Sequence, residues 1–324
     1  MAKIALLGPF TDKMQASFQE ILPAGFELFL VPTKEEYDKL PDADYIVFRT
    51  LEIREETIKT LRRTKLIQRW GVGYDIVDIQ AAGEHRIPVA IMSGINATQV
   101  AEMTILQTLA ALRNLIPLHN GMANGQWLKK EFEKRSYVIQ GKQVGIVGLG
   151  NIGLKVAALF RAFGANIAYY DTPRRPVEIE APVGARYMSL DKLLETSDIV
   201  SLHVPLLEST RHMINKAAIA LMKPTAVIIN TSRGGIIDEA ALYEALSNNR
   251  LLGAGLDVFE NEPLLQDSPL RSLKNVVMSP HIGGSTVDNN GTMAKRAIEN
   301  IVNVSMGQEV SPGDLVNAQY LRKD

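Results

Sequence analysis

Three side chains suited to proton transfer and anion binding follow three successive apolar runs in the second half of the chain. Arg233, Glu262 and His281 each come shortly after a run that is typical of a buried strand. Because the carboxyl ends of parallel strands meet at one edge of a sheet, we expect these side chains to lie close together. A histidine beside a carboxylate can exchange a proton near neutral pH, and the arginine fork matches a planar carboxylate.

Each of the three residues also has a structural explanation when it is taken alone. Arg233 could be a surface ion-pair partner, Glu262 could belong to a solvated acidic loop with Glu260, and His281 could be a buried or capping residue. Their joint arrival at consecutive strand ends favours catalysis. With a nicotinamide cofactor they would reduce a 2-keto acid. His281 would protonate the carbonyl oxygen, Glu262 would orient His281, and Arg233 would hold the carboxylate.

A glycine-rich turn predicts where such a cofactor binds. The apolar run 144–147 is followed by Gly148, Gly150 and Gly153 and then by an amphipathic helical pattern. In this motif the first glycine permits the turn, the second lets the backbone approach a pyrophosphate, and the third lets the helix pack on the strand. Asp171 ends the next strand, where an acidic residue can accept hydrogen bonds from the adenosine ribose.

The charge of Asp171 also bears on the choice of cofactor. A carboxylate at this position would repel the 2′-phosphate of NADP, so NAD is the predicted cofactor. Arg174 and Arg175 follow closely in the sequence and could attract that phosphate instead. NADP therefore stays open as the alternative.

Short apolar runs alternate with helical patterns along the chain, which predicts an α/β fold with parallel sheets. Five runs predict a first sheet with strands at 4–7, 27–31, 45–48, 66–69 and 89–92. Six more predict a second sheet with strands at 144–147, 166–170, 199–203, 227–230, 253–258 and 276–278. The chain is therefore expected to form two doubly wound parallel-sheet domains with a cleft between them, the second a Rossmann dinucleotide-binding domain.

Two long helical patterns lie outside the predicted sheets. The first begins at Thr98 or Gln99 and runs to Ile116, where Pro117 is expected to end it. The following segment, 120–142, is charged and irregular, and could be an arm onto a partner subunit or a loop folded back on the same chain.

The second long pattern, 288–306, has no place in the six-stranded sheet and is expected to return to the first domain. This predicts a discontinuous substrate domain of residues 1–97 and 289–324. The NAD-binding domain would then comprise residues 98–288.

Composition and charge exclude several classes of protein. With 324 residues, 46% hydrophobic and 22% charged, the chain suits two soluble globular domains. A net charge of −1 gives no electrostatic footprint for nucleic acid or an anionic membrane. The absence of cysteine excludes a disulfide framework and cysteine metal sites, and no metal site is predicted. No apolar run has the length of a signal peptide or a membrane span, so a cytoplasmic protein is expected.

The chain resembles the D-isomer-specific 2-hydroxyacid dehydrogenase family over nearly its full length. The resemblance rests on the stretches 144–153, 202–206, 230–235, 256–263 and 280–284. It implies a flavodoxin-like substrate domain, an NAD-binding Rossmann domain, and Arg233, Glu262 and His281 as the catalytic residues. It also implies that Asp257 contacts the nicotinamide amide. The implied cofactor contacts are Gly148, Gly150, Asn151, Ile152, Gly153, Asp171, His203, Pro205, Thr210, Thr231, Asp257 and Gly283.

The resemblance extends to the substrate and to the oligomeric state. Residues 71–75 resemble the family's substrate loop, in which the backbone N–H groups of Val72 and Gly73 would hold the substrate carboxylate. Members of the family are usually dimers with the segment after the first long helix in the interface. A homodimer is therefore expected, with residues 120–142 contributing.

The stretch 280–286 resembles the phosphoglycerate dehydrogenase branch of the family. Arg49, at the end of a strand of the first domain, could then bind the anionic tail of 3-phosphoglycerate, or it could be part of a structural ion pair. The chain ends at Asp324, so the regulatory serine-binding domain of longer members is not expected. Glyoxylate, hydroxypyruvate and D-lactate remain alternative substrate types.

A function of another class is an NAD(H)-sensing binding protein, because corepressors on this scaffold resemble the enzymes down to the three catalytic residues. The absence of a basic face and the compact length argue against it.

Overall fold

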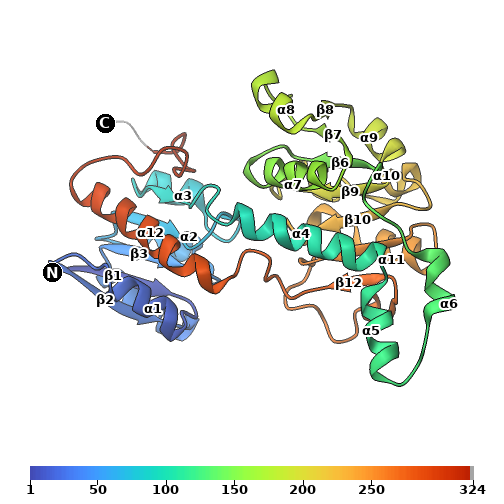
Figure 1. The fold of residues 1–324 in the computed structure, drawn as a ribbon. Coiled ribbons are helices and arrows are strands. Elements are labelled where there is room, and N and C mark those ends of the chain that lie inside the picture. Colours follow the sequence, from blue (N-terminus) through green and yellow to red (C-terminus); the bar gives the residue numbers. More distant parts are fainter. Residues whose placement is uncertain (322–324) are drawn as a thin grey trace. The chain divides into compact units, whose positions relative to one another are not determined.

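The computed structural model describes residues 1–321, which divide into two compact units (Figure 1). Unit 1 contains Met1–Asn96 and the segment that begins at Thr286, and unit 2 contains Ala97–Ser285. Each unit has a parallel sheet with buried hydrophobic clusters of its own.

Unit 1 is built on a five-stranded sheet in the order β2-β1-β3-β4-β5, in which every pair of neighbours is parallel. This is the order of the flavodoxin-like doubly wound fold, so the prediction for this sheet is confirmed. The strands are β1 (Ala2–Leu7), β2 (Phe26–Val31), β3 (Tyr45–Phe48), β4 (Leu66–Arg69) and β5 (Val89–Ala90).

The helices of unit 1 include one from the far end of the sequence. That helix, α12 (Asn290–Ser305), shares a buried apolar cluster with α1 and with β4, for example through Ile298 and Leu66. The others are α1 (Asp12–Gln19), α2 (Glu55–Ile58), α3 (Ile79–Glu84) and the 3-10 helices η1 (Lys34–Asp42) and η5 (Val287–Asn289).

Buried polar contacts hold the segment after α12 on the sheet of unit 1. Asp314 is fully buried, and its carboxylate accepts hydrogen bonds from Arg296 Nε at 2.7 Å and from Asn300 Nδ2 at 3.0 Å. Asn317 Oδ1 accepts the backbone N–H of Val89 at 2.8 Å. Because a buried polar group without a partner is costly, these bonds define where the chain must run.

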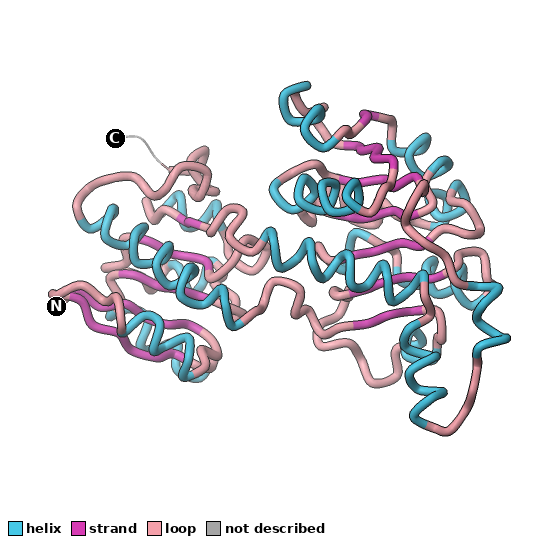
Figure 2. The backbone as a smooth tube through the Cα atoms, viewed as in Figure 1, coloured by secondary structure: helices cyan, strands magenta, loops and turns pink. Residues whose placement is uncertain are grey.

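Unit 2 is built on a seven-stranded parallel sheet in the order β12-β11-β10-β9-β6-β7-β8, drawn as a row of magenta strands in Figure 2. Counted within the unit, this order is the Rossmann order with one further strand, which confirms the predicted fold. The strands are β6 (Gln143–Val147), β7 (Asn166–Tyr170), β8 (Arg186–Tyr187), β9 (Ile199–Leu202), β10 (Val227–Asn230), β11 (Gly253–Leu256) and β12 (Val276–Met278).

The prediction of six strands in this sheet was wrong because it missed β8. This strand has two residues and pairs only with β7 at the sheet edge, so it carries no apolar run that a pattern could detect. The predicted strands 89–92, 199–203 and 253–258 also extend past the observed ends of β5, β9 and β11.

The first long helix was also placed incorrectly at its end. The helix α4 (Ala97–Leu112) ends before Asn114, which has a left-handed φ of 51°, and a second helix, α5 (Leu115–Ala123), then contains Pro117. A proline in the first turn breaks no helical hydrogen bond, because the N–H groups there have no intrahelical acceptor. The segment expected to be irregular contains the end of α5, α6 (Lys129–Phe132) and η2 (Glu133–Arg135).

The remaining helices of unit 2 connect the strands. Two of these helices, α10 and α11, begin at side-chain caps: Asn215 Oδ1 accepts the N–H of Ala217, and Asp238 Oδ1 accepts the N–H of Ala241. The full set of these connecting helices is α7 (Asn151–Ala162), α8 (Val177–Val183), α9 (Leu190–Thr196), α10 (Lys216–Leu221), α11 (Glu239–Ser247), η3 (Gly234–Ile236) and η4 (Pro269–Ser272). Within residues 1–321, no helix is both long and apolar enough to span a bilayer.

Candidate active site

The loops after β11 and β12 bring the predicted histidine and glutamate into direct contact. His281 Nδ1 lies 2.6 Å from Glu262 Oε2, and Glu262 Oε1 accepts the backbone N–H of Phe259 at 3.0 Å. The side chains of His281 and Glu262 are 46% and 36% exposed, so a small molecule can reach the imidazole. Both oxygens of Glu262 thus have hydrogen-bond partners, one in its own loop and one in the loop after β12, and the carboxylate holds the ring in one orientation.

The charge of Glu262 is favoured by this arrangement. Burial raises the pKa of the carboxyl, but the hydrogen bond and charge of His281, the N–H of Phe259 and the charge of Arg233 together lower it below its usual value. An ionised carboxylate only accepts hydrogen bonds, so Nδ1 of His281 must carry the proton that it shares with Glu262. Nε2 is therefore the nitrogen that can give a proton to a substrate or take one from it.

The buried residue Asp257 organises the loop that carries His281. Its Oδ1 accepts the N–H of Ile282 at 3.0 Å, its Oδ2 accepts the N–H of Gly283 at 2.7 Å, and its carbonyl accepts the N–H of His281 at 2.7 Å. His281 has a left-handed φ of 51°, which is unfavourable for a residue with a side chain. The hydrogen bonds to Asp257 stabilise that conformation.

Two further residues of this loop system were not singled out from the sequence. Ser279 donates from Oγ to Asp257 Oδ1 at 2.5 Å, and Gln107 of α4 donates from Nε2 to Ser279 Oγ at 2.8 Å. Gln107 lies 172 positions away from Ser279 in the sequence. A serine and a mid-helix glutamine carry no motif, so only the fold brings this contact to light.

The loop after β10 positions Arg233. Buried Asn230 accepts the N–H and the hydroxyl of Ser232 with Oδ1, at 3.1 and 2.8 Å, and donates from Nδ2 to the carbonyl of Arg233 at 2.9 Å. A Cβ atom at Gly234 would lie 1.8 Å from the carbonyl carbon of Phe259. Only glycine therefore lets this loop pack against the loop that leads to Glu262.

The glycine turn after β6 has the geometry that the motif predicts. Gly148 has a φ of 94° and would place a Cβ 2.6 Å from the carbonyl oxygen of His203, while a Cβ at Gly153 would lie 2.1 Å from the carbonyl oxygen of Gly148. A Cβ at Gly150 would meet nothing within 4 Å. Gly148 and Gly153 are thus required by packing, whereas Gly150 faces open space at the start of α7, where Asn151 and Ile152 form the first turn.

Asp171 is tied to the same turn. Its Oδ2 accepts the N–H of Leu149 at 2.9 Å and its Oδ1 accepts the N–H of Thr172 at 2.8 Å. The carboxylate is thereby held beside the glycine turn, with lone pairs left for further donors.

The two arginines that left NADP open as a cofactor differ in their surroundings. Arg174 donates to both oxygens of Glu180, at 2.8 and 3.0 Å, and lowers the pKa of Glu180 to about 2. This bidentate pair neutralises the guanidinium of Arg174. Arg175 makes no such pair with any carboxylate of residues 1–321; its backbone N–H donates to the hydroxyl of Tyr169 at 3.1 Å.

The other predicted cofactor contacts of unit 2 lie on neighbouring loops. His203 follows β9, and burial lowers its pKa to about 3, so the imidazole is neutral; its Nε2 lies 2.7 Å from Ser201 Oγ. Thr210 donates to the carbonyl of Pro205 at 2.6 Å. Thr231 lies after β10, where its hydroxyl is 3.0 Å from that of Thr104.

The predicted substrate residues belong to unit 1. Within residues 1–321, the backbone N–H groups of Val72 and Gly73 donate to no protein acceptor, so both are available to an anion. Arg49 donates from Nη1 to the carbonyl of Pro9 at 2.7 Å, burial lowers its pKa, and no carboxylate of the described residues pairs with it. Arg69, which was not anticipated, donates to the carbonyl oxygens of Gly73, at 2.6 Å, and of Arg49.

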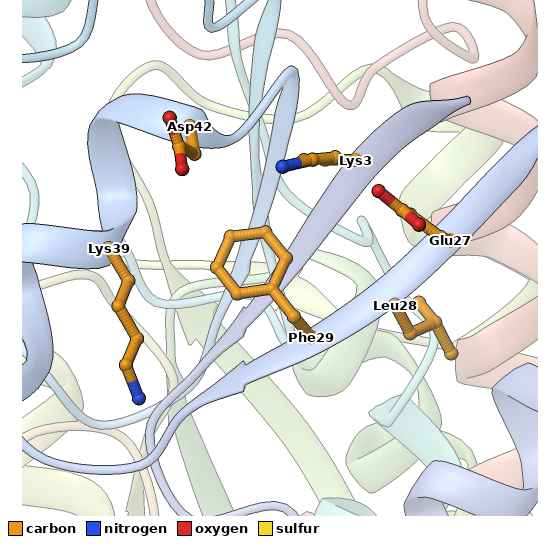
Figure 3. Close-up of a pocket in the computed structure, with 6 residues that line it drawn as sticks. All are labelled: Lys3, Glu27, Leu28, Phe29, Lys39 and Asp42. Atoms are coloured by element: carbon orange, nitrogen blue, oxygen red, sulfur yellow. The ribbon is translucent and has the colours of Figure 1, made fainter.

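Neither the surface pocket nor the acidic and histidine side chains point to a different kind of site. The pocket in Figure 3 combines two lysines with two carboxylates and contains none of the predicted site residues; it is lined by Lys3, Glu27, Leu28, Phe29, Lys39 and Asp42. Among residues 1–321, no three His, Asp or Glu side chains are arranged to hold a metal ion.

The chain is similar to known proteins over most of its length. A family model described as the NAD binding domain of D-isomer specific 2-hydroxyacid dehydrogenases matches residues 105–283. A hydroxypyruvate reductase of Thermotoga maritima is 41% identical over 272 residues, which cover 83% of this chain and 87% of that protein. A D-3-phosphoglycerate dehydrogenase of Methanocaldococcus jannaschii is 37% identical over 96% of this chain, which spans 59% of that protein. Among solved structures, a glyoxylate reductase from Paecilomyes thermophila has a TM-score of 0.85 and 30% identity, with 97% of each chain covered.

Proposed function

Because the chain belongs to the D-isomer specific 2-hydroxyacid dehydrogenase family and is an NAD-dependent dehydrogenase, we propose that His281, Glu262 and Arg233 carry its reaction. The reaction interconverts a D-2-hydroxy acid and its 2-keto acid. One observation carries the proposal: His281 Nδ1 lies 2.6 Å from Glu262 Oε2, which leaves Nε2 to exchange the substrate's proton.

The residues at the glycine turn fit the cofactor. Gly150 leaves open space where a side chain would stand, and the first turn of α7 has N–H groups without intrahelical acceptors. Asp171 beside the turn can accept the ribose hydroxyls. When bound, NAD supplies the hydride for reduction and takes it in oxidation.

In the reducing direction, His281 donates the Nε2 proton to the oxygen of the 2-keto group as that oxygen gains negative charge. Glu262 keeps the ring oriented and stabilises its charged form before the transfer. In the oxidising direction, neutral His281 removes the hydroxyl proton of the substrate with Nε2. Nδ1 cannot do this, because it carries the proton that it donates in the hydrogen bond to Glu262.

The substrate carboxylate is assigned to Arg233 of unit 2. The backbone N–H groups of Val72 and Gly73 in unit 1 are proposed, separately, to bind an anionic group. The guanidinium binds a planar carboxylate and polarises the neighbouring carbonyl. Those two N–H groups have no acceptor within residues 1–321 and form the small donor pair that an anion requires.

Arg49 favours a substrate with a second anionic group, such as 3-phosphoglycerate and the corresponding keto acid. A half-buried guanidinium whose charge no described carboxylate balances is suited to an anionic ligand. The structural ion pair considered from the sequence would have required a carboxylate at this position. Glyoxylate and hydroxypyruvate are the alternatives, since relatives carry those names.

The test of the proposed function is NADH oxidation against 3-phosphohydroxypyruvate, hydroxypyruvate, glyoxylate and pyruvate. Arg49→Gln should raise KM for the phosphorylated acid about tenfold or more and leave that of glyoxylate unchanged. Arg54→Gln is the matched control, because Arg54 already pairs with Glu52 at 3.2 Å. If no acid is turned over although NADH binds, a sensing function replaces the enzymatic one; equal effects on all acids would make Arg49 structural.

We also propose that the protein is a homodimer. Large apolar side chains are exposed on α5 and on the segment that follows, with Trp127 77% and Met122 56% exposed. Exposed apolar clusters of this kind are typical of protein interfaces. Light scattering should give twice the 35.7 kDa mass of the chain, and Trp127→Glu should shift that mass toward the monomer.

A further inference from the structure

We propose that Gln107 and Ser279 are positioning residues for the proton donor, because they act through Asp257 to keep His281 on Glu262. The proposal rests on the proposed function in taking His281 as the donor. None of the three residues has to touch the substrate for this role. Their effect is on the conformation of the loop.

The contacts form one continuous path. Gln107 Nε2 lies 2.8 Å from Ser279 Oγ, and Ser279 Oγ lies 2.5 Å from Asp257 Oδ1. The two carboxylate oxygens of Asp257 accept the N–H groups of Ile282 and Gly283, which follow His281 directly. Any movement of the carboxylate is therefore passed to the loop.

The direction of each hydrogen bond follows from the chemistry of the groups. A carboxylate only accepts, so the single proton of Ser279 points to Asp257. Gln107 must then turn its NH₂ group toward the serine oxygen, since its own oxygen would meet a lone pair. That orientation leaves Oε1 of Gln107 buried, next to Gly255, with no hydrogen-bond partner among residues 1–321. The hydrogen bond to Ser279 is what offsets the cost of burying this amide.

The loop needs such support because His281 has a left-handed backbone, with a φ of 51°. A residue with a side chain keeps that conformation only when its surroundings hold it there. The helix α4 supplies support twice from residues three positions apart. Gln107 reaches the loop of His281, and Thr104 meets Thr231, two residues before Arg233.

Other charges act on the same pair and remain in place when Gln107 or Ser279 is changed. Arg233 lowers the pKa of Glu262, and Glu239, whose own pKa is raised by burial and by nearby Glu260 and Glu262, faces the same loop. His212 pairs with Glu260 at 2.9 Å. A change in the pH profile of a Gln107 or Ser279 variant therefore reports on the loop conformation.

The experiment uses the intact enzyme with Ser279→Ala and Gln107→Leu. Each should lower kcat for the best keto acid about tenfold, because a lost hydrogen bond leaves His281 misaligned for part of the time. The alkaline limb of the profile of kcat against pH should move to lower pH, because the hydrogen bond between His281 and Glu262 is formed for a smaller fraction of the time. NADH affinity, measured by fluorescence, should change by no more than about twofold.

Three further variants make the result specific. Ser279→Thr keeps a hydroxyl and should restore most of the rate. Thr108→Val removes a buried hydroxyl of α4 that donates within its own helix, to the carbonyl of Thr104, and should leave the pH limb unchanged. Adding Ser279→Ala to Glu262→Gln should cost little more, because the two changes remove the same alignment.

The proposal is overturned if Ser279→Ala and Gln107→Leu lower the melting temperature yet keep the native kcat and alkaline limb, while His281→Ala is inactive. In that case the path is purely structural. If His281→Ala also keeps the native rate, the proposed function fails instead.

Discussion

Asp171 Oδ2 accepts the backbone N–H of Leu149 at 2.9 Å, so the acidic residue after β7 is fastened to the glycine turn after β6. The two features were inferred from separate stretches of sequence. Their contact means that the negative charge stands beside the place assigned to the cofactor's phosphates and ribose. That geometry makes the choice between NAD and NADP a question of charge.

We expect NADH to bind more tightly than NADPH. Asp171→Ala should reduce the ratio of the two affinities by about tenfold or more, because it removes the charge that repels a 2′-phosphate. Arg174 does not offset that charge, since Glu180 holds it in a bidentate pair. Fluorescence titration with both cofactors measures the effect. Asp191→Ala, at an exposed carboxylate on α9, is the control. Native affinities that already favour NADPH would contradict the assignment.

Substitution by alanine at two glycines of the turn should affect different properties, protein stability at Gly153 and NADH binding at Gly150. Gly153→Ala places a Cβ 2.1 Å from a carbonyl oxygen and should destabilise the protein by roughly 3 kcal/mol or more. Gly150→Ala meets no protein atom and should change the free energy of unfolding by less than about 1 kcal/mol, yet weaken NADH binding. Thermal melting and titration separate the two effects. Tight NADH binding by Gly150→Ala would show that the cofactor does not approach there.

Glu262→Gln should lower kcat for reduction and move the alkaline limb of its pH profile to lower pH. The carboxylate orients the imidazole and attracts a positive charge on it, and the neutral amide attracts that charge less. Because the pKa of Glu262 is lowered, its carboxylate stays charged at a pH where an ordinary glutamate would begin to take up a proton. In the native enzyme, the effect of Glu262 on His281 therefore persists in mild acid. A profile of kcat against pH checks this. An unmoved limb would rule out Glu262 as the partner of His281.

The sequence was sufficient to predict the features that follow from the regular alternation of apolar runs and helical patterns. The spacing of apolar runs predicted both parallel sheets, and their strand ends located Arg233, Glu262 and His281 on neighbouring loops. The contact of His281 with Glu262 is the outcome that this placement implies, because adjacent strands deliver their loops to one edge.

What the sequence did not reveal depends on contacts between distant residues or on very short elements. The strand β8 has two residues at a sheet edge, and Pro117 sits in a first turn, where it does not end a helix. The pair of Gln107 with Ser279 joins residues that carry no motif. Arg174 was considered a phosphate ligand because its partner, Glu180, is chosen by the tertiary fold.

The role of His281 as proton donor is tested most directly by the rate of 2-keto acid reduction by His281→Ala, measured together with the NADH affinity of that variant. His281→Ala should lose about 10²- to 10⁴-fold in kcat, because the variant lacks the general acid, while its NADH affinity stays nearly unchanged. A native rate in a folded variant that binds NADH normally would contradict the assignment of His281 as the proton donor.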